Sequence, residues 1–437
     1  MKSTKSFVWV SGFVAASLLC GCSNKVLPQG QRISVLDQET AIKAEVADGA
    51  SQIQIPAVTT NSAWKQTDVN AQHVIPNIQA GARFMRIWKS DFGKGSSKHE
   101  FLISQPLING DKVYTLDAEG SMRAFSLRNG ETIWKTLLES KEKNVDDTAI
   151  KGVGMAMEGG VIYATTGFGV VFAVNSADGN ILWQKNMHTL FRIAPVIAAG
   201  KILVQSVDNK FYALDMKNGE KLWDYDIAME NTTMVGGAAP AYSPSLDVVI
   251  AGFANGELQT FNGTIGTPLW SDTLISQRQA YSSTYLHTIT ASPVVEGSKV
   301  YALGRSNVMV ASDIRTGSRI WEKSIGGTDT PLLAGNALYV TTEKQELVAI
   351  NKTNGRILWA KNIDFGDKKK SERVFAPVMI DSRLVLALSN GELLFYNPQN
   401  GNLIDRFDTG EDLNASPIAV NGYVLLVTEN AKIIAYQ

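Results

Sequence analysis

Cysteine is almost absent from this chain of 437 residues. Its two cysteines, Cys20 and Cys22, both lie in the first 22 residues, so the rest of the chain has no disulfide, no thiolate metal site and no thiol nucleophile. Histidine is also scarce, and its four positions show neither a His-Glu-x-x-His motif nor paired spacing. They are His73, His99, His188 and His287. With no Asp-x-Asp-x-Asp-Gly loop for calcium either, the sequence predicts no catalytic residues, no metal site and no cofactor.

An excess of either charge is missing as well. The chain has 41 basic and 42 acidic side chains, a formal net charge of −1. The one basic cluster, Lys368–Lys370, lies beside Asp364, Asp367 and Glu372, which is typical of a solvated surface loop. We therefore expect no nucleic-acid partner.

The apolar run at the N-terminus, Phe7–Leu19, is too short to span a membrane. It follows Lys2 and Lys5 and has the layout of a secretory signal. It ends in Leu19-Cys20-Gly21-Cys22, which resembles a bacterial lipobox. We therefore expect residues 1–22 to be a lipoprotein signal peptide and lipobox, with acyl chains such as palmitate on Cys22. A cleaved signal with an incidental cysteine is the alternative.

Residues 23–76 are polar and irregular, with Pro28, Pro56 and Pro76 spread through them. Gln52–Val58 could form an edge strand or dock on a folded body, but the composition favours a flexible tether. In lipoproteins of the kind that the lipobox resembles, Ser23 after the cysteine points to the outer membrane.

The remainder of the chain is built from repeats. Ala194–Trp223 holds four short β-type runs separated by turn residues, and Asn218-Gly219 suits a tight hairpin. Gly-x-x-x-Trp closes six such units, and a seventh has the turn but ends in Asp405. The six pairs are Gly130/Trp134, Gly179/Trp183, Gly219/Trp223, Gly266/Trp270, Gly317/Trp321 and Gly355/Trp359. A four-stranded sheet cannot bury both faces alone, so the copies must stack on one another.

The two ends of the repeat region complement each other. After Asp405 the chain has three β-type runs and stops, whereas Arg83–Lys89 is a lone strand carrying Trp88. The simplest arrangement completes the last unit with this N-terminal strand, giving a closed all-β propeller of eight four-stranded antiparallel blades over residues 77–437. We expect each tryptophan to pack between neighbouring blades.

The unit also resembles a known repeat. Tyr212–Asp215 (Tyr-Ala-Leu-Asp) followed by Gly-x-x-x-Trp looks like the pyrroloquinoline-quinone (PQQ)-type propeller repeat. With the lipobox, and with Asp313–Trp321 and Ile325–Pro331, the chain resembles the BamB family of outer-membrane assembly lipoproteins. The resemblance implies a non-catalytic scaffold, lipid-anchored in the outer membrane and facing the periplasm. Its partner would be a BamA-like barrel insertase and the assembly complex around it, and its only membrane contact would be the anchor.

Two other functions remain open. A periplasmic PQQ-dependent dehydrogenase has the same repeat, but its family usually has a vicinal disulfide beside the quinone, and this chain has no Cys-Cys pair. A ligand-binding propeller is the other alternative, since a repeat predicts the fold better than the role.

The resemblance also suggests where a partner would bind. In BamB relatives two adjacent loops bind the periplasmic domains of BamA, with an Arg-Gly pair and an Asp-x-Asp pair in contact. Aligned on Pro240 and Pro293, these positions are Val235-Gly236 and Thr288-Ile289-Thr290, so the charges are absent. We expect Met234, Val235, Thr288 and Thr290 to contribute to partner binding.

Overall fold

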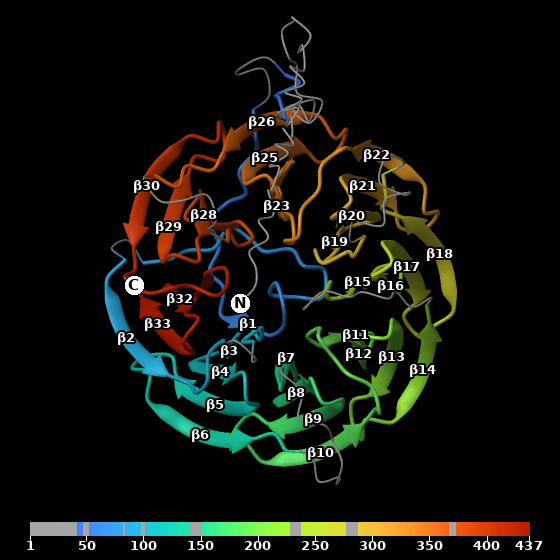
Figure 1. Cartoon of the computed structure of the whole chain (residues 1–437), viewed down its shortest axis with the longest axis vertical. Helices are drawn as coiled ribbons and strands as arrows, with labels where there is room; N and C mark the ends of the chain where they lie inside the picture. The colour runs from blue at the N-terminus through green and yellow to red at the C-terminus, as the bar shows by residue number, and fades with distance from the viewer. Residues whose placement is uncertain are drawn as a thin grey trace, which may run out of the picture. The chain divides into compact units, whose positions relative to one another are not determined.

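Short strands alternate with turns throughout the repeat region, and each group of four forms one antiparallel sheet (Figure 1). A computed structural model describes residues 42–46, 52–81, 84–97, 101–139, 151–227, 237–276, 287–366 and 373–437. All of them belong to one unit, Ile42–Gln437. The predicted signal peptide and Cys22 lie outside the described residues.

Blade three shows how the sequence forms the unit. Its strands are β11 (Val196–Ala198), β12 (Lys201–Gln205), β13 (Lys210–Asp215) and β14 (Lys221–Asp226). The middle strands are buried on both faces, whereas the outer strand β14 alternates between exposed and half-buried residues. A sheet with two apolar faces is stable only between two neighbours, so the blades form a ring.

The other blades repeat this order from the inner strand to the outer one. Blade one has β3 (Leu107–Asn109), β4 (Lys112–Leu116), β5 (Ser121–Ser126) and β6 (Thr132–Leu137), and blade two has β7 (Gly152–Glu158), β8 (Val161–Thr166), β9 (Val170–Asn175) and β10 (Ile181–Asn186). Blade four has β15 (Ala241–Ser243), β16 (Val248–Gly252), β17 (Glu257–Asn262) and β18 (Pro268–Thr273), and blade five has β19 (Val294–Glu296), β20 (Lys299–Gly304), β21 (Val308–Asp313) and β22 (Arg319–Lys323). Blade six has β23 (Leu332–Ala334), β24 (Ala337–Thr341), β25 (Glu346–Asn351) and β26 (Ile357–Asn362), and blade seven has β27 (Val378–Ile380), β28 (Arg383–Ala387), β29 (Glu392–Tyr396) and β30 (Leu403–Asp408).

Blade eight joins the two ends of the ring. Its sheet consists of β31 (Ile418–Val420), β32 (Tyr423–Val427), β33 (Lys432–Tyr436) and the N-terminal strand β2 (Arg86–Asp91). In the register, Trp88 is opposite Ala435 and Arg86 is opposite Tyr436. The predicted closed eight-bladed propeller is confirmed. The closing strand begins at Arg86 rather than at Arg83, which lies outside the described residues.

The closing tryptophans lie between blades, as expected. Six of the seven indole Nε1–H groups in blades one to six and eight donate to a backbone carbonyl of the next blade, at 2.7–3.2 Å. The donor and acceptor pairs are Trp88–Leu127, Trp134–Ser176, Trp183–Met216, Trp270–Ile314, Trp321–Lys352 and Trp359–Pro398. The seventh, Trp223, stacks on Phe261 at 6.0 Å between ring centroids, and its Nε1 has no hydrogen-bond partner.

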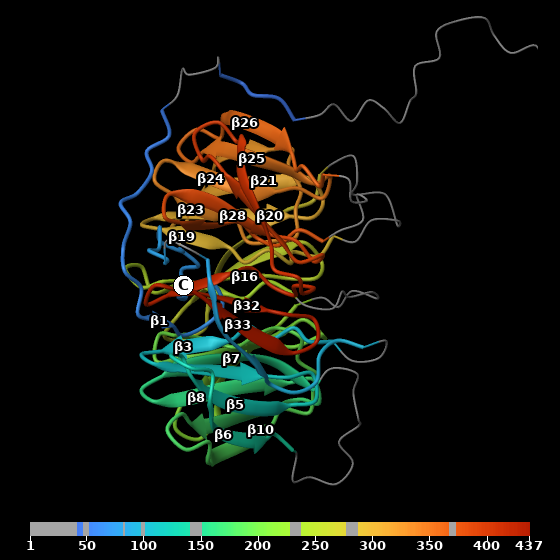
Figure 2. The same cartoon turned by 90° about the vertical axis from the view of Figure 1, so that its left-hand side faces the viewer.

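Residues 52–81, named here the plug segment, differ from the tether expected for residues 23–76. They run along one face of the ring (blue, left in Figure 2). Within them β1 (Ala63–Trp64) pairs with β3 as a fifth strand of blade one, and Ile53 and Trp64 are buried. Residues 52–76 are therefore part of the folded body, because burial of these side chains and backbone pairing hold them on the blades.

The plug segment contacts every blade. It accepts a hydrogen bond from each of the eight blades, and in blades seven and eight it also donates one, from Ile78 N to Met379 O and from Gly81 N to Gly422 O. The bonds that reach the segment, in the order of the blades, are Gly110 N–Ser62 O, Met157 N–Lys65 O, Ile197 N–Gln66 Oε1, Tyr242 N–Ala71 O, Val295 N–Gln72 O, Thr330 Oγ1–Asp68 Oδ2, Asp381 N–Ile78 O and Asn421 N–Asn61 O.

Candidate functional site

The ring has two different faces. Because strands alternate in direction, the turns between the first and second strands and between the third and fourth strands of each blade lie on one face. The plug segment covers part of this face, as its contacts with Gly110, Asp381 and Gly422 show. The opposite face carries the connections between blades and the turns between second and third strands. We call it the connection face.

A cavity of about 660 Å³ lies at the centre of the ring and is lined by residues of all eight blades. Thr67 and Asp68 of the plug segment form part of its wall, as do Arg192, Arg305 and Arg373, which come from the connection face. The cavity therefore extends from the plug segment towards the connection face.

Asp68 and His73 form a buried pair beside this cavity. The carboxylate of Asp68 accepts a hydrogen bond from Thr330 Oγ1 at 2.9 Å, and His73 Nδ1 lies 2.8 Å from the carbonyl oxygen of Pro293. Burial raises the pKa of Asp68 and lowers the pKa of His73, because removal from water penalises the charged form of each group. The pair thus joins the plug segment to blades five and six.

The three arginines of the cavity wall are held differently. Arg305 Nε lies 2.6 Å from Glu343 Oε1, and the guanidinium carbon of Arg373 lies 4.8 Å from the centre of the Phe375 ring. Arg192 has no ion pair among the described residues. That part of the chain also contains no group of three or more His, Cys, Asp or Glu side chains that could hold a metal ion.

The two connections singled out by the sequence leave neighbouring blades. Their bases are joined, because Ala239 N donates to Ser292 Oγ at 3.2 Å, and the second base is also held on blade four, because Ile289 N donates to Phe253 O at 3.1 Å. Residues 237–239 and 287–292 therefore form a fixed base for both connections, next to blades four and five.

The predicted partner-binding residues fall at different places. Met234 and Val235 lie outside the described residues. Thr288 is only 4% exposed and lines a small cavity of about 30 Å³. Thr290 lines the central cavity, and its Oγ1 donates to Thr328 O at 3.0 Å.

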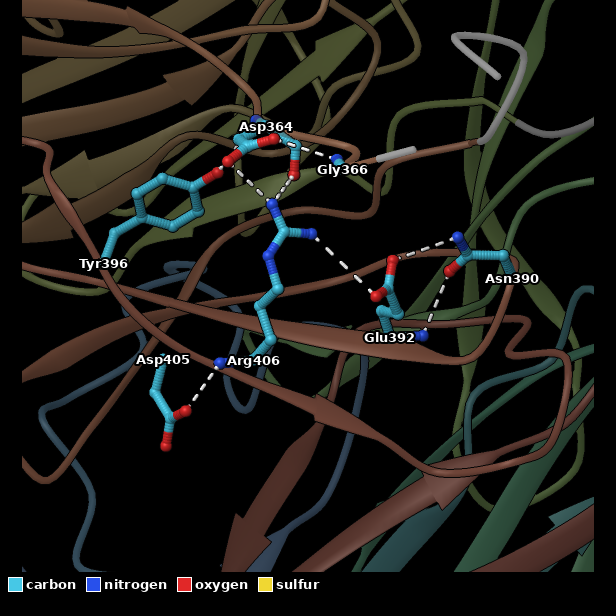
Figure 3. Close-up of polar contacts among 7 residues, drawn as sticks. All are labelled: Asp364, Gly366, Asn390, Glu392, Tyr396, Asp405 and Arg406. Atoms are coloured by element: carbon cyan, nitrogen blue, oxygen red, sulfur yellow. Dashed lines mark hydrogen bonds and ion pairs between the residues drawn. The ribbon is translucent and has the colours of Figure 1, made fainter. Parts of the chain in front are cut away.

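A third connection, between blades six and seven, is held by Arg406 (Figure 3). Its guanidinium donates to the backbone carbonyl of Asp364 at 2.7 Å and pairs with the carboxylate of the same residue at 2.8 Å. The partner that the structure gives Asp364 is thus an arginine of strand β30. The neighbouring Lys368–Lys370 lie outside the described residues.

Comparisons with known proteins agree with this architecture. Residues 118–361 match the family model described as "Outer membrane protein assembly factor BamB". The chain belongs to the BamB family. The prediction of a non-catalytic protein is confirmed by this membership, since the family consists of assembly factors in outer-membrane protein assembly.

Individual relatives are distant but extensive. The BamB proteins of Yersinia pestis and Burkholderia pseudomallei are 24% and 22% identical to this chain, covering 60% and 80% of it and 67% and 87% of their own lengths. The crystal structure of BamB from Moraxella catarrhalis superposes with a TM-score of 0.68 at 19% identity, over 81% of this chain and 99% of that one. A quinohemoprotein alcohol dehydrogenase from Comamonas testosteroni has a TM-score of 0.66 at 11% identity, over 86% of this chain and 80% of the enzyme. This second likeness shows the shared fold alone.

Sequence reasoning missed the residues that line the central cavity. The signal for them is the recurrent small residue followed by proline that opens a unit. Five units open with such a pair: Ala194-Pro195, Ala239-Pro240, Ser292-Pro293, Ala376-Pro377 and Ser416-Pro417. In four of these five units, the residue two positions before the pair lines the cavity. The four residues are Arg192, Gly237, Thr290 and Asn414.

Proposed function

We propose that this BamB-family protein is a lipid-anchored docking module in the outer membrane, which faces the periplasm and holds the periplasmic domains of a BamA-like barrel insertase. The observation that carries the proposal is the contrast between the two faces. The plug segment occupies part of one face, whereas the connection face carries two neighbouring connections on a fixed base. Loops on a rigid scaffold are the usual position of binding residues.

The mechanism is geometric. Eight interlocked blades hold the bases of the connections in place, so that a partner meets a surface that is already organised. The residues proposed to contact the partner are Met234, Val235 and Thr290. We include Thr288 with them as a buried residue that supports the contact surface.

Affinity capture of the full chain from detergent-solubilised membranes tests the docking face. We expect the barrel insertase to be recovered with the wild-type chain and to be reduced several-fold by Val235→Asp, because a buried unpaired charge weakens an interface. The matched control is Thr353→Arg, an exposed position in a turn on the opposite face. Absence of the insertase from the wild-type capture, together with dye-linked alcohol oxidation on adding quinone and Ca²⁺, would overturn the proposal.

The lipid anchor is tested separately with Cys22→Ser. Without the acylated cysteine the chain should move from the membrane fraction to the soluble or unprocessed one, since apolar burial of the acyl chains is the anchoring force. Unchanged fractionation would contradict lipidation at Cys22 but not the docking face.

A further inference from the structure

The outer strands carry an aliphatic residue directly before each closing residue. Seven of the eight are 44–53% exposed, whereas Leu358 in β26 is 7% exposed. The exposed ones are Ile87, Ile133, Leu182, Leu222, Leu269, Ile320 and Ile404. The outer strand of blade six therefore differs from the other outer strands, because another part of the protein covers its aliphatic residue Leu358.

The cover is a short piece of the same chain, residues 42–46, named here the rim segment. Glu45 N donates to Ile357 O at 2.8 Å, and Ile357 N donates to Glu45 Oε2 at 3.0 Å. Val46 packs against the apolar cluster that includes Leu358, and Ile42 packs against the cluster that includes Ile357. The rim segment thus adds backbone hydrogen bonds and apolar contacts to an edge strand, a recognised mode of peptide binding.

Charge accounts for the choice of blade. Two positions face each other across each seam between blades: the second residue after the closing tryptophan of one blade, and the residue after the glycine of the Gly-x-x-x-Trp motif in the next blade. At blades two and three these residues are Lys185 and Glu220, which form an ion pair of 3.2 Å. At blades five and six the same positions hold two cations, Lys323 and Arg356. Among the described residues this is the only such pair of cations.

Glu45 supplies the missing acid. Both of its carboxylate oxygens accept hydrogen bonds from Lys323 Nζ, at 2.7 and 2.8 Å. The two cations and the Ile357 N–H thus surround one carboxylate, and charge-assisted hydrogen bonds of this kind are stronger than neutral ones.

We propose that Lys323, Arg356, Ile357 and Leu358 form a peptide-binding site, the rim site, for an extended segment with an acidic residue between aliphatic residues. Its resident ligand is the rim segment of the same chain. The site lies on the outer edge of the ring, and the proposal does not depend on the proposed function. In the part of the chain that the structure describes, no other seam combines two cations with an edge strand that has a covered aliphatic residue.

The test uses the full chain with Glu45→Lys, which places a third cation beside Lys323 and Arg356 and expels the rim segment. The matched control is Lys43→Gln, since Lys43 is exposed on the same segment and has no ion pair among the described residues. Hydrogen exchange should show the Ile357 amide losing protection in Glu45→Lys and keeping it in Lys43→Gln.

Binding is then measured with a fluorescent peptide of residues 41–47. It should bind the Glu45→Lys chain at least about ten-fold more tightly than the wild-type chain, whose site is occupied. Replacing the glutamate of the peptide by glutamine, or adding Lys323→Met to the chain, should weaken binding about ten-fold. Unchanged Ile357 protection in Glu45→Lys, or equal binding of the glutamate and glutamine peptides, would overturn the rim site.

Discussion

At the scale of single residues, the glycine and the tryptophan of Gly-x-x-x-Trp act on different neighbours. Each glycine has a positive φ, and a Cβ added to it would come within 2.3–2.8 Å of the tryptophan of the preceding blade. Gly317, for example, faces Trp270, and Gly355 faces Trp321. Each motif therefore takes part in two contacts between blades: its glycine receives the tryptophan of the preceding blade, and its tryptophan packs on the glycine of the next blade. Both contacts depend on the spacing within the motif, so this spacing stays constant while the loops vary.

The same geometry explains why Asp405 replaces the seventh tryptophan. Its blade is followed by blade eight, whose third and fourth strands, β33 and β2, come from opposite ends of the chain. No turn joins them, so no turn glycine is there to receive an indole. An aromatic cluster fills this seam instead: Phe84 lies 5.3 Å from Phe395 and 5.6 Å from Phe407, and Phe407 lies 5.5 Å from Tyr436, between ring centroids.

The glycine–tryptophan contact predicts a difference between two glycine substitutions in blade five. Gly317→Ala and Gly297→Ala both place a side chain at a positive φ, +73° and +59°, so their backbone strain is similar. Only Gly317→Ala meets a ring, at 2.8 Å, whereas nothing lies within 4 Å of Gly297. In chemical denaturation, Gly317→Ala should lower the midpoint clearly more, by an extra cost of about 1–3 kcal/mol for overpacking. Equal midpoints would mean that the contact adds nothing to stability.

At the scale of elements, the plug segment is what the sequence did not reveal. Its only strand, β1, has two residues, and its other hydrogen bonds come singly from irregular backbone or from scattered side chains such as Asn77. Periodicity cannot detect such a segment, since it has no repeating pattern of burial. One signal was present in the sequence, namely Trp64, which lies outside the repeats. Exposure of a large aromatic side chain to water is unfavourable, so a tryptophan in this segment indicates that the segment packs on the folded body.

Asn77 gives a test of how firmly the plug segment is held. Its side-chain amide donates to Pro56 O at 2.8 Å and Ser382 Oγ at 3.0 Å, and its Oδ1 accepts from Ser382 N at 2.9 Å. Asn77 itself is buried and its partners are half-buried, so Asn77→Ala removes three hydrogen bonds from the inner side of the segment, at a cost of about 1–3 kcal/mol. Protease cleavage within residues 52–81 should therefore become faster. Gln79→Ala is the control, because Gln79 is exposed in the same segment, and equal cleavage of the two variants would show that Asn77 does not hold it.

At the scale of the whole molecule, the ring was predictable from the sequence, and the side chains of the proposed docking surface were not. The ring follows from counting repeats and from the match between a lone strand at one end and a missing one at the other, both of which are properties of the sequence. Partner contacts depend on the particular side chains of the connections. At Val235 and Thr288 these lack the charges that the family resemblance implies, so a repeat pattern fixes their place without fixing their chemistry.

Because β2 closes the ring, we predict that the loss of Trp88 destabilises the protein more than the loss of Trp321, although the two tryptophans make similar contacts. Trp88 and Trp321 are both 8% exposed, and each donates its Nε1–H to the next blade, at 2.8 and 2.9 Å. Replacing either by alanine should remove a similar packing energy, on the order of 3–5 kcal/mol.

The difference lies in what remains after the substitution. Blades five and six stay joined by the chain beside Trp321, but β2 is held in blade eight by pairing with β33 and by side-chain packing. Once β2 detaches, the ring becomes an open array whose end blades can fray. Trp88→Ala should therefore speed hydrogen exchange in β31, β32 and β33 and lower the unfolding midpoint further than Trp321→Ala does. If both variants unfold at the same midpoint and β33 keeps its protection, the N-terminal strand is not what holds the ring closed.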